Sequence, residues 1–139
     1  DMLKGAGAAW AGTQFGHDYG FFGENFGFLA GFLAAFGHCF SVFLGGKGGK
    51  GVATALGATC VLLPAAAGLG VFVWVALAAF FRIAAVSSIA AMVVMAVVSR
   101  LNGYGFEADM FTVGLFCLIA IRHISNLKQL KQRWFGDSS

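Results

Sequence analysis

The segment from Gly45 to Gly51 has the composition of an anion-binding loop. It holds five glycines and two lysines between two strongly apolar stretches. Backbone N–H groups of a glycine-rich loop that opens a helix can close around phosphate oxygens, while lysine supplies positive charge. The loop alone leaves two interpretations open, a phosphate site or a flexible turn whose lysines set the membrane topology. The residues that would hold a phosphate are Lys47, Gly48, Gly49, Lys50 and Gly51.

A second group of polar residues lies near the end of the chain, in Arg122-His123-x-x-Asn126. His123 and Asn126 are three residues apart, so on a helix they share one face. Ionisable groups at membrane depth are candidates for function. Two simpler roles stay open, because Arg122 could extend to the membrane surface and His123 could bond a backbone carbonyl.

His38 belongs with the glycine-lysine loop, and Asp1 with Lys4 forms a third group at the start of the chain. His38 precedes the glycine-lysine loop and would add a titratable group to a phosphate site there. It could instead bond the backbone near the end of a helix. Asp1 and Lys4 could form an ordinary ion pair between residues three apart.

The composition indicates a membrane protein. Of the 139 residues, 59% are hydrophobic and only 11% are charged, and sixteen are phenylalanine. Soluble domains carry about 25% charged residues. A chain of this length could not bury so much apolar surface in its own core, so lipid must surround it. We find no basic stripe with interleaved aromatic residues and expect no nucleic-acid partner, and no residue spacing predicts a metal site or a cofactor.

Five apolar runs predict an all-α bundle of membrane helices: Met2–Ala11, Phe26–Leu44, Val52–Phe81, Ile83–Ser99 and Met110–Ile121. A run of about 20 residues crosses a hydrocarbon core of ~30 Å. The thirty residues of Val52–Phe81 are too many for one straight span, and Pro64 offers a break. We therefore predict about six helices, with the two around Pro64 short.

The charges support this arrangement. With a break at Pro64, eight of the nine basic residues fall on one side, and only Arg100 does not. By the positive-inside rule that side is the cytoplasm, and the C-terminus lies there too. One span in place of two would move Arg82 and the tail across and remove the asymmetry. The eight residues are Lys4, Lys47, Lys50, Arg82, Arg122, Lys128, Lys131 and Arg133.

Small residues recur every fourth position at Gly23, Gly27, Gly31 and Ala35. Such a stripe lets membrane helices approach closely. We expect it to serve packing and not chemistry.

The glycine-lysine loop is not a P-loop. Gly46 and Gly51 have the spacing of G-x-x-x-x-G-K-[ST], but Val52 follows and no strand precedes. The residues by themselves therefore predict a membrane protein with a cytoplasmic phosphate site and a nearby histidine. A transferase acting on a phosphorylated substrate and a transporter or binding protein for a phosphorylated anion both fit. A transporter would be expected to show paired broken helices, and no second glycine-lysine loop occurs.

Gly37–Thr54 closely resembles the signature G-H-x-F-P-V-F-L-G-F-K-G-G-K-G-V-A-T of the bacterial acyl-phosphate-dependent glycerol-3-phosphate acyltransferases. Asp1-x-x-Lys4-Gly5 looks like the D-x-x-K-G of the preceding helix, and Arg122-His123-x-x-Asn126 resembles the closing R-H-x-x-N. The matches occur in family order from the first residue to the tail.

The resemblance implies a seven-helix fold in the bacterial inner membrane. It also implies transfer of a fatty acyl group from acyl phosphate to the 1-hydroxyl of glycerol 3-phosphate, which gives lysophosphatidic acid. The glycines, Lys47, Lys50 and the neighbouring His38 would hold a substrate phosphate. His123 and Asn126 would belong to the catalytic centre.

The sequence also departs from the family pattern. Ser41 stands in place of a proline and Gly46 in place of a phenylalanine. The family's first motif, G-S-G-N-x-G-x-T-N-x-x-R, has no counterpart in the 139 residues. We therefore expect residues 1–139 to be a single, N-terminally truncated transmembrane domain. By itself it would bind phosphate weakly and catalyse little.

Overall fold

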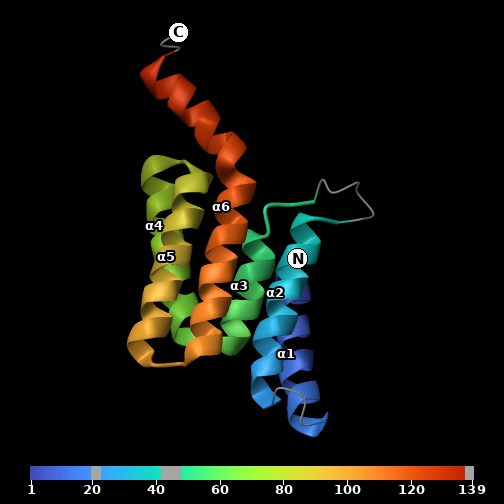
Figure 1. The fold of residues 1–139 in the computed structure, drawn as a ribbon. Helices are drawn as coiled ribbons and strands as arrows, with labels where there is room; N and C mark the ends of the chain where they lie inside the picture. The colour runs from blue at the N-terminus through green and yellow to red at the C-terminus, as the bar shows by residue number, and fades with distance from the viewer. Residues whose placement is uncertain (20–22, 42–47, 137–139) are drawn as a thin grey trace.

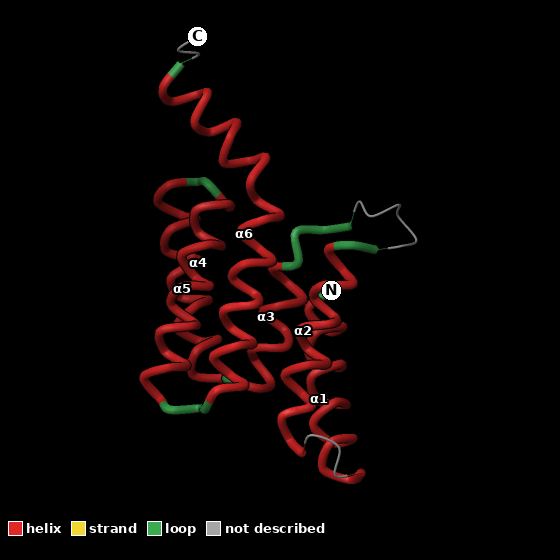
Figure 2. Tube along the Cα trace, in the orientation of Figure 1, coloured by secondary structure: helices red, strands yellow, loops and turns green. Residues whose placement is uncertain are grey.

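The computed structural model describes residues 1–19, 23–41 and 48–136, and these form helices and loops without a strand (Figure 2). The helices are α1 (Met2–Tyr19), the short 3₁₀ helix η1 (Gly23–Asn25), α2 (Phe26–Cys39), α3 (Val52–Leu62), α4 (Pro64–Phe81), α5 (Ala84–Asn102) and α6 (Phe106–Phe135). The predicted all-α bundle is therefore confirmed.

Successive helices run in opposite directions, so the chain returns repeatedly to one end of the bundle (Figure 1). The beginning of α1, the end of α2, the beginning of α3, the α4–α5 turn at Arg82 and the second half of α6 all lie there. We call this the loop end. Because the sequence reasoning placed the same segments together, the predicted grouping is confirmed.

The predicted break at Pro64 is confirmed as well. Leu63 leaves the helical region with φ −138° and ψ 64°, and Pro64 is the first residue of α4. Proline suits this position because its missing N–H would have no partner in the first turn. One expectation is corrected. Of the two helices around Pro64, α3 is short with 11 residues, but α4 has 18 and is long enough to cross a membrane.

Other helix ends also differ from the apolar runs. The apolar run Phe26–Leu44 predicted one long helix, but α2 ends at Cys39. Phe40 leaves the helical region with φ −118° and ψ 50°. The last helix begins four residues before Met110, at Phe106, and continues to Phe135. Its first turn carries Glu107 and Asp109, which favour a helix N-terminus although they are not apolar.

The stripe of small residues packs as predicted. Gly27, Gly31 and Ala35 are buried in α2, whereas Gly23 lies in η1. A Cβ on Gly31 would come within 2.9 Å of the Ala58 Cβ on α3. Close approach of this kind drives association in lipid, where hydrophobicity does not.

The α1–α3 contact brings two backbones together. A side chain at Gly57 would overlap the carbonyl of Met2, and one at Gly5 would overlap that of Thr54. This contact holds the beginning of α1 against the beginning of α3.

We expect Gly57→Ala to lower the free energy of unfolding by about 1–3 kcal/mol, because the obstructing atom belongs to the backbone. Thermal unfolding of the detergent-solubilised protein measures this. The control is Gly68→Ala on α4, where no atom lies within 4 Å of the added Cβ. Equal melting temperatures for the two variants would contradict the close α1–α3 contact.

Candidate phosphate-binding site at the loop end

The described part of the glycine-lysine loop, Gly48–Gly51, runs against the end of α2. The Gly49 N–H donates a hydrogen bond to the His38 carbonyl at 3.2 Å. A Cβ on Gly48 would overlap the backbone carbonyl of His38, so the chain passes this closely only as glycine. Gly51 precedes α3 with φ 77° and lies against the Cys39 side chain. Its left-handed conformation also favours glycine.

Arg122 reaches the loop from α6. Its guanidinium donates to the Gly48 carbonyl at 2.7 Å and to the Gly49 carbonyl at 3.3 Å. The same group lies 5.4 Å from the centre of the Phe40 ring. Sequence reasoning gave Arg122 only a place at this end of the bundle or an anchoring role at the membrane surface. The structure shows that it contacts the loop directly.

Asp1 lies between two basic groups. Its Oδ1 is 3.2 Å from the Lys4 Nζ and 3.5 Å from the His38 Nδ1. The ion pair with Lys4 was one of the predicted interpretations and is confirmed. The proximity to His38, on another helix, could not be seen in the sequence.

Gly49 lines two cavities at the loop end. One has a volume of about 410 Å³ and a mixed wall whose polar members are Asp1, Lys4, His38 and Ser41. The other, of about 660 Å³, combines the cations Lys50 and Arg122 with the apolar residues Phe40, Ile121 and Ile124. The loop end therefore offers cationic groups in both cavities and an apolar wall in one.

His123 is buried in the bundle, with 1% of its surface exposed. Its Nδ1 lies 2.8 Å from the Ile119 carbonyl. Because a carbonyl only accepts hydrogen bonds, Nδ1 carries a proton, and in a neutral imidazole Nε2 is then the acceptor. His123 lines neither of the two cavities at the loop end.

The predicted site residues are thus brought together in part. His38, Gly48, Gly49, Lys50 and Gly51 lie side by side with Arg122, and His123 follows Arg122 on α6. Lys47 lies outside the described residues, and so does the side chain of Asn126. Within the described ranges, no group of three or more side chains could hold a metal ion.

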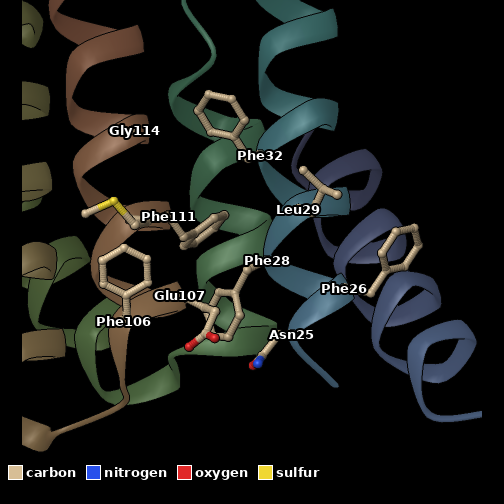
Figure 3. Close-up of a pocket in the computed structure, with 10 residues that line it drawn as sticks. Asn25, Phe26, Phe28, Leu29, Phe32, Phe106, Glu107, Phe111 and Gly114 are labelled. Atoms are coloured by element: carbon tan, nitrogen blue, oxygen red, sulfur yellow. The ribbon is translucent and has the colours of Figure 1, made fainter. Parts of the chain in front are cut away.

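A third cavity lies between α2 and α6 toward the opposite end of the bundle and differs in character (Figure 3). Its volume is about 360 Å³, and Phe28, Phe32 and Phe111 form much of its wall. Its polar members are Asn25 and Glu107, and among the described residues no cation lines it. It does not suit a phosphate.

Helices of this length and composition, with a cationic glycine loop at one end, are those of a polytopic membrane protein with a candidate anion-binding site. Two helices, α4 and α5, are long and apolar enough to cross a membrane. Residues 1–133 match the family described as glycerol-3-phosphate acyltransferase. The chain belongs to this family.

Two curated relatives show the extent of the similarity. The glycerol-3-phosphate acyltransferase of Aliarcobacter butzleri is 35% identical over 133 residues, which cover 94% of this chain and 61% of the relative. That of Jannaschia sp. is 45% identical over 112 residues, covering 78% of this chain and 53% of the relative. The chain therefore spans roughly 50–60% of these relatives' length.

Two crystal structures are similar in fold. Both are of PlsY, an integral membrane glycerol 3-phosphate acyltransferase, one in its glycerol 3-phosphate form and one in its lysophosphatidic acid form. Each has a TM-score of 0.83 and 31% identity over 95% of this chain. The match covers 64% of the first structure and 65% of the second.

We expect Gly51→Ala to expose Cys39, which is buried against Gly51. An alanine at positive φ costs about 1–2 kcal/mol, so the thiol should react with a maleimide roughly five- to thirtyfold faster. Peptide mass spectrometry distinguishes Cys39 from Cys60 and Cys117. The control is Gly37→Ala, whose Cβ would meet nothing within 4 Å. Unchanged labelling in Gly51→Ala would mean that the loop does not need this backbone conformation.

Proposed function

We propose that residues 1–139 form one transmembrane domain of an acyltransferase that uses acyl phosphate and glycerol 3-phosphate. The reaction gives lysophosphatidic acid and phosphate in phospholipid synthesis. The observation that carries the proposal is the meeting of Gly48–Lys50, Arg122 and His38 at the loop end. Membership of the family favours this reaction over transport of a phosphorylated anion.

The phosphate site that we propose lies where the loop enters α3. Gly49 N–H is engaged with His38, so the cradle uses the amides that follow, from Lys50 into the first turn of α3. The helix N-terminus favours an anion there, and the Lys50 ammonium adds a full charge. Lys47 would add a second.

The two cavities suit two different substrates. Glycerol 3-phosphate is small and polar and fits the cavity with Lys4 and His38. Acyl phosphate needs cations for its head and an apolar wall for its chain, as Phe40, Ile121 and Ile124 supply beside Lys50. Gly49 lines both cavities, so the substrates would meet at the loop.

The reaction requires no acyl-enzyme, because acyl phosphate is already an activated anhydride. The acceptor hydroxyl oxygen attacks the acyl carbon, the carbon–oxygen bond to phosphate breaks, and phosphate leaves with that electron pair. Holding the reactants in register supplies much of the rate, and Lys50 offsets charge on the leaving group. The hydroxyl proton goes to Nε2 of His123 or to a phosphate oxygen. We place His123 and Asn126 in the catalytic centre because they match the closing R-H-x-x-N of the family; in this structure His123 is buried and lines neither of the two cavities.

The cation-rich loop end would face the cytoplasm, following the distribution of basic residues. Relatives from bacteria favour the bacterial inner membrane as the location. Both substrates would then reach the loop end from the cytoplasmic side, and the product would stay in the membrane.

The function is tested in membranes that contain this chain, with acyl phosphate and labelled glycerol 3-phosphate. Because the chain spans 61% of its Aliarcobacter relative, the assay is run with the chain alone and with the relative's N-terminal segment fused in front. Labelled lysophosphatidic acid in the fused form supports the proposal. Failure of both forms to make it, when the fused protein is folded, overturns it.

In the active form, Lys50→Ala should raise KM for acyl phosphate by about 10–100-fold, since Lys50 lines the cavity assigned to that substrate and a hydrogen bond to a charged group contributes about 1.5–3 kcal/mol. The control is Lys128→Ala, which removes an exposed cation further along α6. If the two substitutions raise KM equally, Lys50 contributes only to the overall positive charge of the surface and does not bind the phosphate.

His123→Asn separates a catalytic role from a structural one. The asparagine amide can keep the bond to the Ile119 carbonyl but has no counterpart of Nε2. If His123 accepts the proton, kcat should fall about 10²–10⁴-fold with KM little changed. Retention of kcat would leave the phosphate oxygen as the proton acceptor.

A further inference from the structure

We propose that Arg122 is a positioning residue that fixes Gly48 and Gly49, in the described part of the glycine-lysine loop, between α2 and α6 before any substrate binds. The effect of Arg122 on KM rests on the proposed function. Its effect on the order of the loop does not, because that order can be measured without substrate.

One peptide unit shows the arrangement most directly. The carbonyl of Gly48 accepts from Arg122 at 2.7 Å, and the N–H of Gly49, on the same peptide, donates to the His38 carbonyl at 3.2 Å. The peptide plane is therefore held from both sides, by α6 and by the end of α2. A second bond to the Gly49 carbonyl at 3.3 Å fixes the next peptide as well.

Arg122 also contacts Phe40, which lies before the loop in the sequence. Phe40 directly follows α2, and its ring lies under the guanidinium at 5.4 Å. The guanidinium of Arg122 thus contacts Phe40, at the end of α2, and also the backbone of Gly48 and Gly49, before α3. The planar guanidinium supplies several donors in a fixed fork and can stack on an aromatic ring, which an ammonium group cannot do in the same way.

These contacts explain why an arginine lies at this depth. A side chain that only extended to the membrane surface would direct its charge to water or headgroups. Arg122 directs it to two carbonyls instead, and a charged donor makes stronger hydrogen bonds than a neutral one. With the carbonyls of Gly48 and Gly49 turned toward α6, the following amides are set at the beginning of α3. Those are the amides that the proposed phosphate cradle needs.

Trypsin cleavage after Lys50 in the substrate-free protein is the primary test. Loss of two hydrogen bonds from a charged donor should raise the cleavage rate in Arg122→Ala about tenfold or more. Arg122→Lys keeps the charge without the fork and should lie between Arg122→Ala and the unchanged chain. Lys128→Ala, which removes one cation from the same helix, should leave cleavage at Lys50 unchanged.

The kinetic measurement uses the active form of the enzyme. If loss of Arg122 disorders the loop, Arg122→Ala should raise KM for glycerol 3-phosphate about tenfold or more. Across Arg122→Ala and Arg122→Lys, the increase in KM should follow the increase in the rate of trypsin cleavage. A higher KM with an unchanged rate of trypsin cleavage after Lys50 would make Arg122 a direct substrate ligand and overturn the proposal. Normal protection with normal KM would reduce Arg122 to a membrane anchor and overturn it too. Faster cleavage in a protein that makes no product in any form would support the positioning role and count against the acyltransferase function instead.

Discussion

Close contact between helix backbones is the constraint on which the structure depends. In lipid, apolar side chains gain little by leaving one apolar surrounding for another, so helices associate where small residues let their atoms approach. Gly5 and Gly57 bring α1 against α3, and Gly31 brings α2 against Ala58 of α3. These contacts place the beginning of α1, the end of α2 and the beginning of α3 at one end of the bundle.

The polar groups at that end are consequences of this packing. Asp1 approaches His38 because α1 packs against α2, and Arg122 reaches Gly48 because α6 lies beside α2. Most residues of the loop are glycines, which offer backbone groups but no side chains, and the surrounding helices add charged side chains. Arg122 holds the carbonyls of Gly48 and Gly49, and the helix N-terminus that follows them is suited to holding an anion.

Sequence reasoning predicted the features that depend on local chemistry. Composition predicted the membrane class, Pro64 predicted the break between α3 and α4, and the spacing of Gly27, Gly31 and Ala35 predicted close packing. The signature around the loop predicted the family. Helix ends were less well predicted, because hydropathy does not register residues such as Glu107 that are polar yet favour a helix N-terminus.

The direction of individual side chains was beyond the sequence. Arg122 and His123 are neighbours, but one turns to the loop and the other into the bundle, where it bonds the Ile119 carbonyl. Adjacent residues on a helix point about 100° apart, and which of them faces the core depends on the rotation of α6 against α2 and α5. The sequence by itself determined the class, the family and the end of the bundle at which the polar residues gather. Only the packing of the helices decided that an arginine, through its carbonyl contacts, holds the loop, because those contacts join residues more than seventy positions apart.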